Sequence, residues 1–100
     1  MPDDNNMLVL NLTFPIGQLV TTAAVASEVP MSAIQAALTR YCSRDWGDLD
    51  DEDREANEDA VAGHGRLLAV YPSGLEGEDT IWIITEADRS VTTVLFPSEY

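Results

Sequence analysis

Residues 81–96 read IWIITEADRSVTTVLF, two apolar runs joined by a short polar turn. Both runs are rich in β-branched and aromatic residues, which favour strands. In the first run, Ile83 falls on one side of a strand and Trp82 and Ile84 fall on the other, so both sides are apolar. A strand with one solvated face would alternate between apolar and polar residues. We therefore expect an antiparallel hairpin at the centre of a sheet, with both faces covered.

Outside this hairpin, the apolar pattern predicts further elements. Short apolar runs predict strands at residues 7–12, 18–21 and 66–71. Apolar residues at helical spacing predict a helix at residues 30–44, with Pro30 in its first turn. We expect this helix to cover one face of the hairpin. The N-terminal segment or a second subunit is expected to cover the other face.

The fold class that these elements define is α+β. A chain of 100 residues supports one modest core and one domain, residues 1–100, in which residues 1–6 form a polar tail. Helices dominate the first half and strands the second. We therefore expect two to three helices packed on a small antiparallel sheet of roughly three to five strands, ending in a C-terminal meander.

An acidic segment between residues 45 and 59 holds half of the eighteen acidic residues. Its carboxylates are Asp45, Asp48, Asp50, Asp51, Glu52, Asp53, Glu55, Glu58 and Asp59. We expect a helix from an N-cap at Asp48 to a stop at Gly63. Five of the carboxylates crowd one arc of this helix, opposite a thin apolar stripe. The members of this arc are Asp51, Glu52, Glu55, Glu58 and Asp59.

Trp46 lies between the two predicted helices and precedes Gly47, which lets the chain turn. An indole at such a position is typical of an anchor that holds two helices on a sheet. We therefore interpret Trp46 as structural rather than as part of a ligand site.

A metal site is one interpretation of the acidic segment. Asp48, Asp50 and Glu52 alternate, and Asp59 occupies the last ligand position of a calcium loop. That loop requires Gly at its sixth position, where this chain has Asp53. A helix explains the segment without a ligand, so we expect no metal.

Catalytic residues are equally sparse. Cys42 and His64 are the only residues of their types, and nothing in the sequence places them together. Glu86, Asp88 and Arg89 form the only compact acid and base group outside the acidic segment, and they are the secondary candidate site. A local pairing within a hairpin turn explains them as well. We expect no cofactor and no catalytic residue.

The overall charge limits the partners. The formal net charge is −13, with five Arg and no Lys, which argues against direct binding of nucleic acid or anionic membrane. No apolar run is long enough to span a membrane, and the acidic N-terminus is unlike a signal peptide. A single Cys suits a reducing cytosol, so we expect a cytoplasmic protein. A homodimer is compatible with these features.

The acidic segment has a charge density close to that of nucleic acid. Fifteen helical residues span about 22 Å, over which one strand of duplex DNA carries roughly six or seven phosphates. The segment could therefore imitate nucleic acid before a basic protein surface. The competing interpretation is a plain solvated helix face.

Five stretches carry a resemblance to a known family. They are residues 14–20 (FPIGQLV), 45–48 (DWGD, followed by Glu52, Asp53 and Asn57), 66–71 (RLLAVY), 81–90 (IWIITEADRS) and 93–100 (TVLFPSEY). On these, the chain resembles the small "plasmid-related" proteins of conjugative elements and plasmids of Proteobacteria. That family has no established activity, so the resemblance implies a setting, a mobile element in a bacterial cell.

Small acidic proteins in that setting often disarm host defence as anti-CRISPR or anti-restriction factors. The resulting prediction is a non-enzymatic interaction protein whose acidic segment binds the basic surface of a nucleic-acid-binding complex, with a CRISPR–Cas effector favoured. One alternative is a regulatory or housekeeping module of the element whose acidic face only solvates the protein. Another is a small hydrolase centred on Glu86, Asp88 and Arg89.

Overall fold

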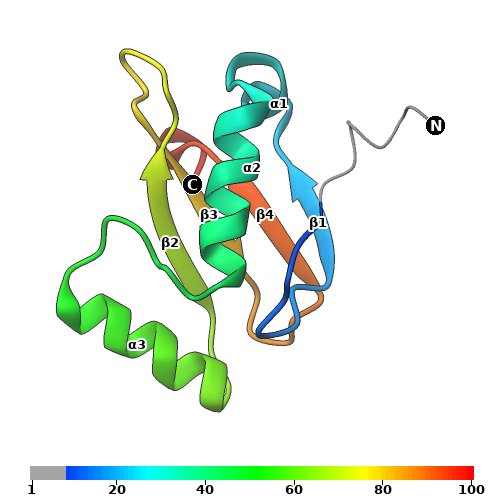
Figure 1. Ribbon diagram of the computed structural model, residues 1–100, viewed down its shortest axis with the longest axis vertical. Coiled ribbons are helices and arrows are strands. Elements are labelled where there is room, and N and C mark those ends of the chain that lie inside the picture. Colours follow the sequence, from blue (N-terminus) through cyan, green and yellow to red (C-terminus); the bar gives the residue numbers. More distant parts are fainter. Residues whose placement is uncertain (1–8) are drawn as a thin grey trace.

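The computed structural model describes residues 9–100 and contains a four-stranded sheet with helices packed against it (Figure 1). Its elements are, in chain order, β1 (Gln18–Thr21), α1 (Ala23–Glu28), α2 (Met31–Cys42), α3 (Asp51–Ala62), β2 (Leu67–Pro72), β3 (Thr80–Thr85), β4 (Val91–Leu95) and the one-turn 3₁₀ helix η2 (Pro97–Glu99). The strand order is β1-β4-β3-β2. The predicted α+β class is confirmed.

The sheet is mostly antiparallel, with one exception at its edge. β3 pairs antiparallel with both β2 and β4, so these three strands form the C-terminal meander that the sequence predicted. β1 joins β4 in parallel, because the chain enters it beside the turn between β3 and β4, where Gln18 N–H donates to Ser90 O at 3.0 Å. The sheet is therefore mixed.

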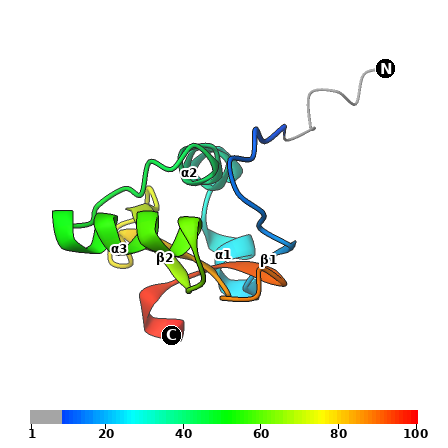
Figure 2. The same cartoon turned by 90° about the horizontal axis from the view of Figure 1, so that it is seen from below.

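The hairpin of β3 and β4 lies at the centre of the sheet, as its apolar pattern predicted. On one face, Ile81, Ile83 and Val94 are fully buried beneath α2 and the segment that precedes β1. Figure 2 shows α2 on one side of the sheet and the C-terminal end of the chain on the other. The expectation that the first long helix covers one face of the hairpin is confirmed.

The opposite face has a different cover from the one expected. Ile84 and Leu95 are buried there, and the Tyr100 ring that follows η2 lies 5.4 Å from the Trp82 ring. The N-terminal segment instead packs on the α2 side, where the Phe14 ring lies 5.4 Å from that of Tyr41. Among the described residues, the expectation that this segment covers the second face is therefore wrong.

The predicted strand at residues 7–12 does not form in its described part. Residues 9–12 are outside any strand, and Met7 and Leu8 lie outside the described residues. The Thr13 hydroxyl donates to Cys42 O at 2.7 Å and fastens the segment to the end of α2. This contact places the segment in the helix layer, away from the edges where a strand could pair.

A buried chain of hydroxyl groups joins α2 to the sheet and to the N-terminal segment. The Thr92 hydroxyl donates to Ile16 O at 2.7 Å, so it accepts from Thr85, also at 2.7 Å. Thr85 in turn accepts from the Tyr41 hydroxyl at 2.6 Å. Every member thus has a partner, which is what a buried polar group requires. Burial raises the pKa of Tyr41 strongly, so its phenol stays protonated as the donor.

Candidate protein-interaction surface

The acidic helix α3 begins two residues later than the sequence predicted. Its N-cap is Asp50, whose side chain accepts from Asp53 N–H at 2.9 Å, rather than Asp48. Asp48 is held in extended backbone because its N–H donates to Val70 O at 2.8 Å. Gly47, at φ 76°, makes the turn before it. The helix ends before Gly63, as expected.

The outer edge of β2 is where α3 is fixed. Val70 N–H donates to Trp46 O, and Val70 O accepts from Asp48. Two residues earlier along β2, the Asn57 side chain donates to Leu68 O at 2.9 Å and accepts from Leu68 N–H at 3.3 Å. Asn57 is buried and replaces a neighbouring strand at this point. Sequence reasoning missed this role. The available signal was a single amide side chain among the acids of α3.

Trp46 is the anchor between α2 and α3 that the sequence predicted. Its side chain is only 3% exposed, and its ring lies 5.6 Å from that of Phe14 and 5.5 Å from that of Tyr41. Its indole N–H donates to Glu58 Oε2 at 2.9 Å. Trp46 thus connects the aromatic core directly to the acidic helix.

Glu58, a member of the acidic arc, therefore also makes contacts that hold α3 in place. It accepts a hydrogen bond from the Trp46 indole and forms an ion pair with Arg44. Arg44 lies just after the end of α2 and has a φ of 67°. The Arg44 hydrogen bond, with a smaller contribution from Trp46, lowers the pKa of Glu58 below its ordinary value of 4.5. Because the folded pKa is depressed, this stabilisation is present above pH 4.5 and is lost as pH falls through the lowered pKa. Of the five arc residues, Glu58 is the one that contacts both Trp46 and Arg44.

Two other acidic residues of the segment also have cationic partners. Asp45 pairs with Arg40 Nε at 2.8 Å, and this contact lowers the pKa of Asp45. Asp51 lies 3.7 Å from Arg54. Within residues 9–100, the remaining six form no ion pair: Asp48, Asp50, Glu52, Asp53, Glu55 and Asp59.

Three of these unpaired residues form what we call the α3 carboxylate row: Glu52, Glu55 and Asp59. They are exposed and spaced three and four residues apart, so they share one side of the helix. Figure 1 shows α3 beyond the β2 edge of the sheet, to the side of α2. The row therefore faces solvent on an element that projects from the sheet.

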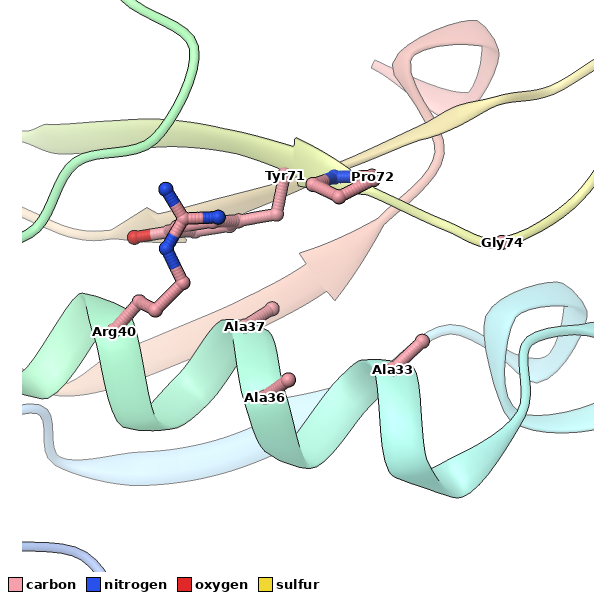
Figure 3. Close-up of a pocket in the computed structure, with 7 residues that line it drawn as sticks. All are labelled: Ala33, Ala36, Ala37, Arg40, Tyr71, Pro72 and Gly74. Carbon is pink, nitrogen blue, oxygen red and sulfur yellow. The ribbon is translucent and has the colours of Figure 1, made fainter.

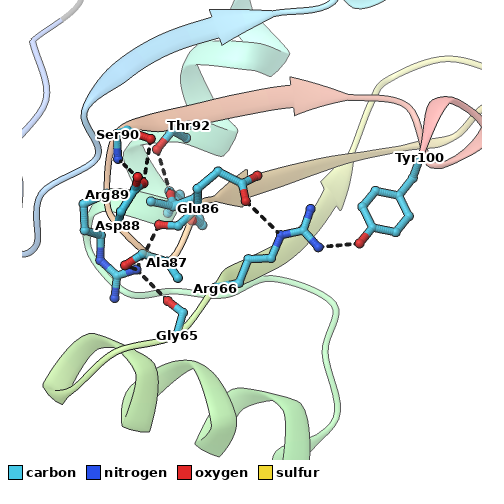
Figure 4. A network of polar contacts seen from close by, with 11 residues as sticks. Gly65, Arg66, Glu86, Ala87, Asp88, Arg89, Ser90, Thr92 and Tyr100 are labelled. Carbon is cyan, nitrogen blue, oxygen red and sulfur yellow. Dashed lines mark hydrogen bonds and ion pairs between the residues drawn. The ribbon is translucent and has the colours of Figure 1, made fainter.

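The secondary candidate residues, Glu86, Asp88 and Arg89, lie in the turn between β3 and β4, and each has its own local partner (Figure 4). Glu86 lies 3.5 Å from Arg66 Nε. The Asp88 carboxylate accepts from the N–H and the hydroxyl of Ser90, and these bonds lower its pKa. No ion pair joins any two of the three candidates within the described residues.

Arg89 binds backbone carbonyl groups near the end of α3, a role that the sequence around it did not indicate. Its guanidinium donates to Ala60 O at 2.7 Å and to Gly65 O at 2.6 Å. Ala60 O is one of the carbonyl groups that the end of α3 leaves without an intrahelical partner. Arg89 thus ties the far end of the acidic helix to the central hairpin. The same side chain is not aimed at either neighbouring carboxylate.

Two shallow hollows flank β2. One, of about 200 Å³, lies between α2 and the end of β2 and is lined by Ala33, Ala37 and Tyr71 (Figure 3). Arg40 lies over the Tyr71 ring, 5.2 Å from its centre, and is already paired with Asp45. The other, of about 240 Å³, lies between α3 and β2. The first hollow has no free acid, base or nucleophile with which to act on a ligand.

Nucleophilic catalysis and metal binding find little support in the described part of the chain. Cys42 is buried and burial raises its pKa, which disfavours the thiolate that a nucleophile needs. Residues 9–100 contain no group of three or more His, Cys, Asp or Glu side chains placed to hold a metal ion. Over the same residues, no helix has the length and apolar character needed to cross a membrane.

Comparison of the chain with known protein families, curated proteins and solved structures found no match. The resemblance to plasmid-related proteins therefore stays a prediction based on its motifs.

Proposed function

We propose that this protein binds a basic, nucleic-acid-binding surface of another protein and competes there with nucleic acid. The observation that carries the proposal is the α3 carboxylate row, three exposed carboxylates on one side of a helix that projects beyond the sheet, none of which forms an ion pair within residues 9–100.

The spacing of the row suits a surface that normally holds phosphates. Glu52, Glu55 and Asp59 are separated along the helix axis by about 4.5 Å and about 6 Å, at 1.5 Å per residue. One strand of duplex DNA presents a phosphate roughly every 3.4 Å of axis. Lys and Arg side chains are long enough to accommodate this difference, so a basic groove can engage either ligand.

The fixation of α3 supports the same proposal. Three hydrogen bonds fix the helix to the rest of the protein: Trp46 donates to Glu58, Asn57 of the helix donates to Leu68 O, and Arg89 donates to Ala60 O. A ligand that is rigid before it binds loses less conformational entropy on association. The backbone that carries the row is therefore ordered before binding, and only the exposed side chains lose conformational freedom on association.

The partner class we favour is a CRISPR–Cas effector, with other restriction or defence complexes as members of the same class. This choice rests on the resemblance to proteins of mobile elements and on the charge of −13, which accelerates encounter with basic surfaces. The protein would act in the bacterial cytoplasm as an inhibitor without catalytic activity. A regulatory role within the mobile element is the alternative.

Competition with nucleic acid tests this proposal. We expect the tagged protein to capture a nucleic-acid-binding complex from a host lysate, and a short duplex DNA added in excess to release it. Binding should also weaken between low and high salt, because the screening length falls from about 10 Å at 0.1 M to about 3 Å at 1 M. A partner that stays bound in excess duplex and at high salt would contradict the proposal.

A further inference from the structure

The two edges of the sheet differ in how their backbone groups are satisfied. At the β2 edge, the outward groups of Leu68 bond to Asn57 and those of Val70 bond to Trp46 and Asp48. The strand then ends at Pro72, which has no N–H. These features prevent another strand from pairing at this edge.

The β1 edge has no such protection within residues 9–100. Gln18 and Thr22 direct their N–H groups towards β4, so the intervening Leu19 and Thr21 direct theirs away from the sheet. No described residue bonds to the N–H or C=O groups of Leu19 or Thr21. An edge of this kind is a template for a further strand.

The sequence segment that contains β1 is uncharged, although the protein is strongly acidic. Residues 5–27 contain no charged side chain, and every Glu and Arg lies after them. A carboxylate that contacts this segment is that of Glu99, which accepts from the Thr22 hydroxyl at 2.8 Å. A second copy therefore meets fewer carboxylates here than at the β2 edge, beside which the acidic helix α3 lies. Figure 1 places α3 beyond the opposite edge of the sheet, so the two acidic helices would stay far apart.

We propose that β1 pairs with β1 of a second copy, antiparallel about a two-fold axis at Val20, to form a continuous sheet across a homodimer. The outward groups of Leu19 would then face those of the partner's Thr21, and the same pair would recur on the other side of the axis. Each such pair exchanges two hydrogen bonds. Val20 would form the central pair without hydrogen bonds, in which the two Cα atoms lie about 4.5 Å apart. The acidic row of each copy would remain free for its own partner.

Disulfide trapping in the full chain tests both the dimer and its register. We expect Val20→Cys to form a covalent dimer under mild oxidation, because the expected separation suits a disulfide. Gln18→Cys is the matched control in the same strand. In this register it faces Thr22 of the second copy and lies four residues from its own counterpart, so it should not form the bond. Cys42 is buried and leaves the new thiol as the reactive one.

The unlinked protein supplies the second measurement. In sedimentation experiments from micromolar to millimolar concentration, the mass should rise from 10.9 kDa towards twice that value. Added salt should strengthen this association, since the copies carry like charge, whereas it should weaken binding to a basic partner. Thr21→Pro removes an outward N–H and should weaken the dimer about tenfold or more, with the melting temperature showing whether the fold is kept.

A protein that stays at 10.9 kDa throughout, with no faster cross-linking of Val20→Cys than of Gln18→Cys, would overturn the proposal and leave the β1 edge open to a strand from an unrelated protein. Equal cross-linking of both variants would also overturn it, because the pairing would lack the stated register.

Discussion

Trp46→Ala should lower the free energy of unfolding by about 3–5 kcal/mol, the usual range when a buried Trp or Phe is truncated to Ala. The loss combines burial of the indole, which is 3% exposed, with its contacts to Phe14 and Tyr41. It also leaves Glu58 without its indole donor. Urea unfolding followed by circular dichroism measures the change, since the substitution removes one of the two Trp fluorophores.

Trp82→Ala is the matched control for this substitution. Trp82 is half-buried on the opposite face of the sheet, beside Tyr100, and the structure gives its indole N–H no hydrogen-bond partner within the described residues. We expect it to cost roughly half as much or less. Equal losses at the two positions would contradict the role of Trp46 as the anchor of α3.

Gly47→Ala is expected to cost about 3 kcal/mol or more. Gly47 has a φ of 76°, and an added Cβ would lie 1.9 Å from Val70 O. Left-handed backbone costs an L-residue about 1–2 kcal/mol, and relief of the clash would break the bonds that join Val70 to Trp46 and Asp48. Because these bonds position the start of α3, helix docking should weaken together with stability.

Gly74→Ala separates the clash from the backbone strain. Gly74 has a similar φ of 82°, but nothing lies within 4 Å of an added Cβ. It should therefore cost only about 1–2 kcal/mol. Thermal unfolding of the two variants side by side measures the difference, and similar melting temperatures would show that the contact between Gly47 and β2 contributes little.

The sequence predicted the fold best where its pattern was local. The hairpin of β3 and β4 is apolar on both sides, and its central position follows from that pattern. The parallel pairing of β1 could not be predicted in this way. Its orientation depends on the contact of Thr13 with Cys42 and of Ile16 with Thr92, which join parts of the chain far apart in sequence.

The candidate surface was predicted in composition but not in detail. The number and helical spacing of the carboxylates indicated an acidic helix face. The distinction between its members depends on tertiary contacts: Glu58 is held by Arg44 and Trp46, whereas Glu55, three residues earlier, has no ion-pair partner within residues 9–100. The shift of the N-cap from Asp48 to Asp50 has the same origin, because pairing with β2 overrode the local preference.

The central claim is that the position of the α3 carboxylate row, and not net charge alone, creates the binding surface. The direct measurement is the affinity of a captured partner for two variants that each lose three negative charges. One carries Glu52→Gln, Glu55→Gln and Asp59→Asn. The other carries the changes Glu28→Gln, Glu76→Gln and Asp79→Asn, at exposed positions outside α3.

Both variants should be as stable as the parent, and the first slightly more so, since like charges spaced along a helix repel. At low salt, the row variant should lose roughly tenfold in affinity, because three exposed charge pairs at roughly 0.2–1 kcal/mol each contribute about 0.6–3 kcal/mol together. The control variant should stay within about threefold of the parent, which corresponds to less than 1 kcal/mol. Equal losses in the two variants, or none in the row variant, would contradict the account and leave α3 as a solvated helix.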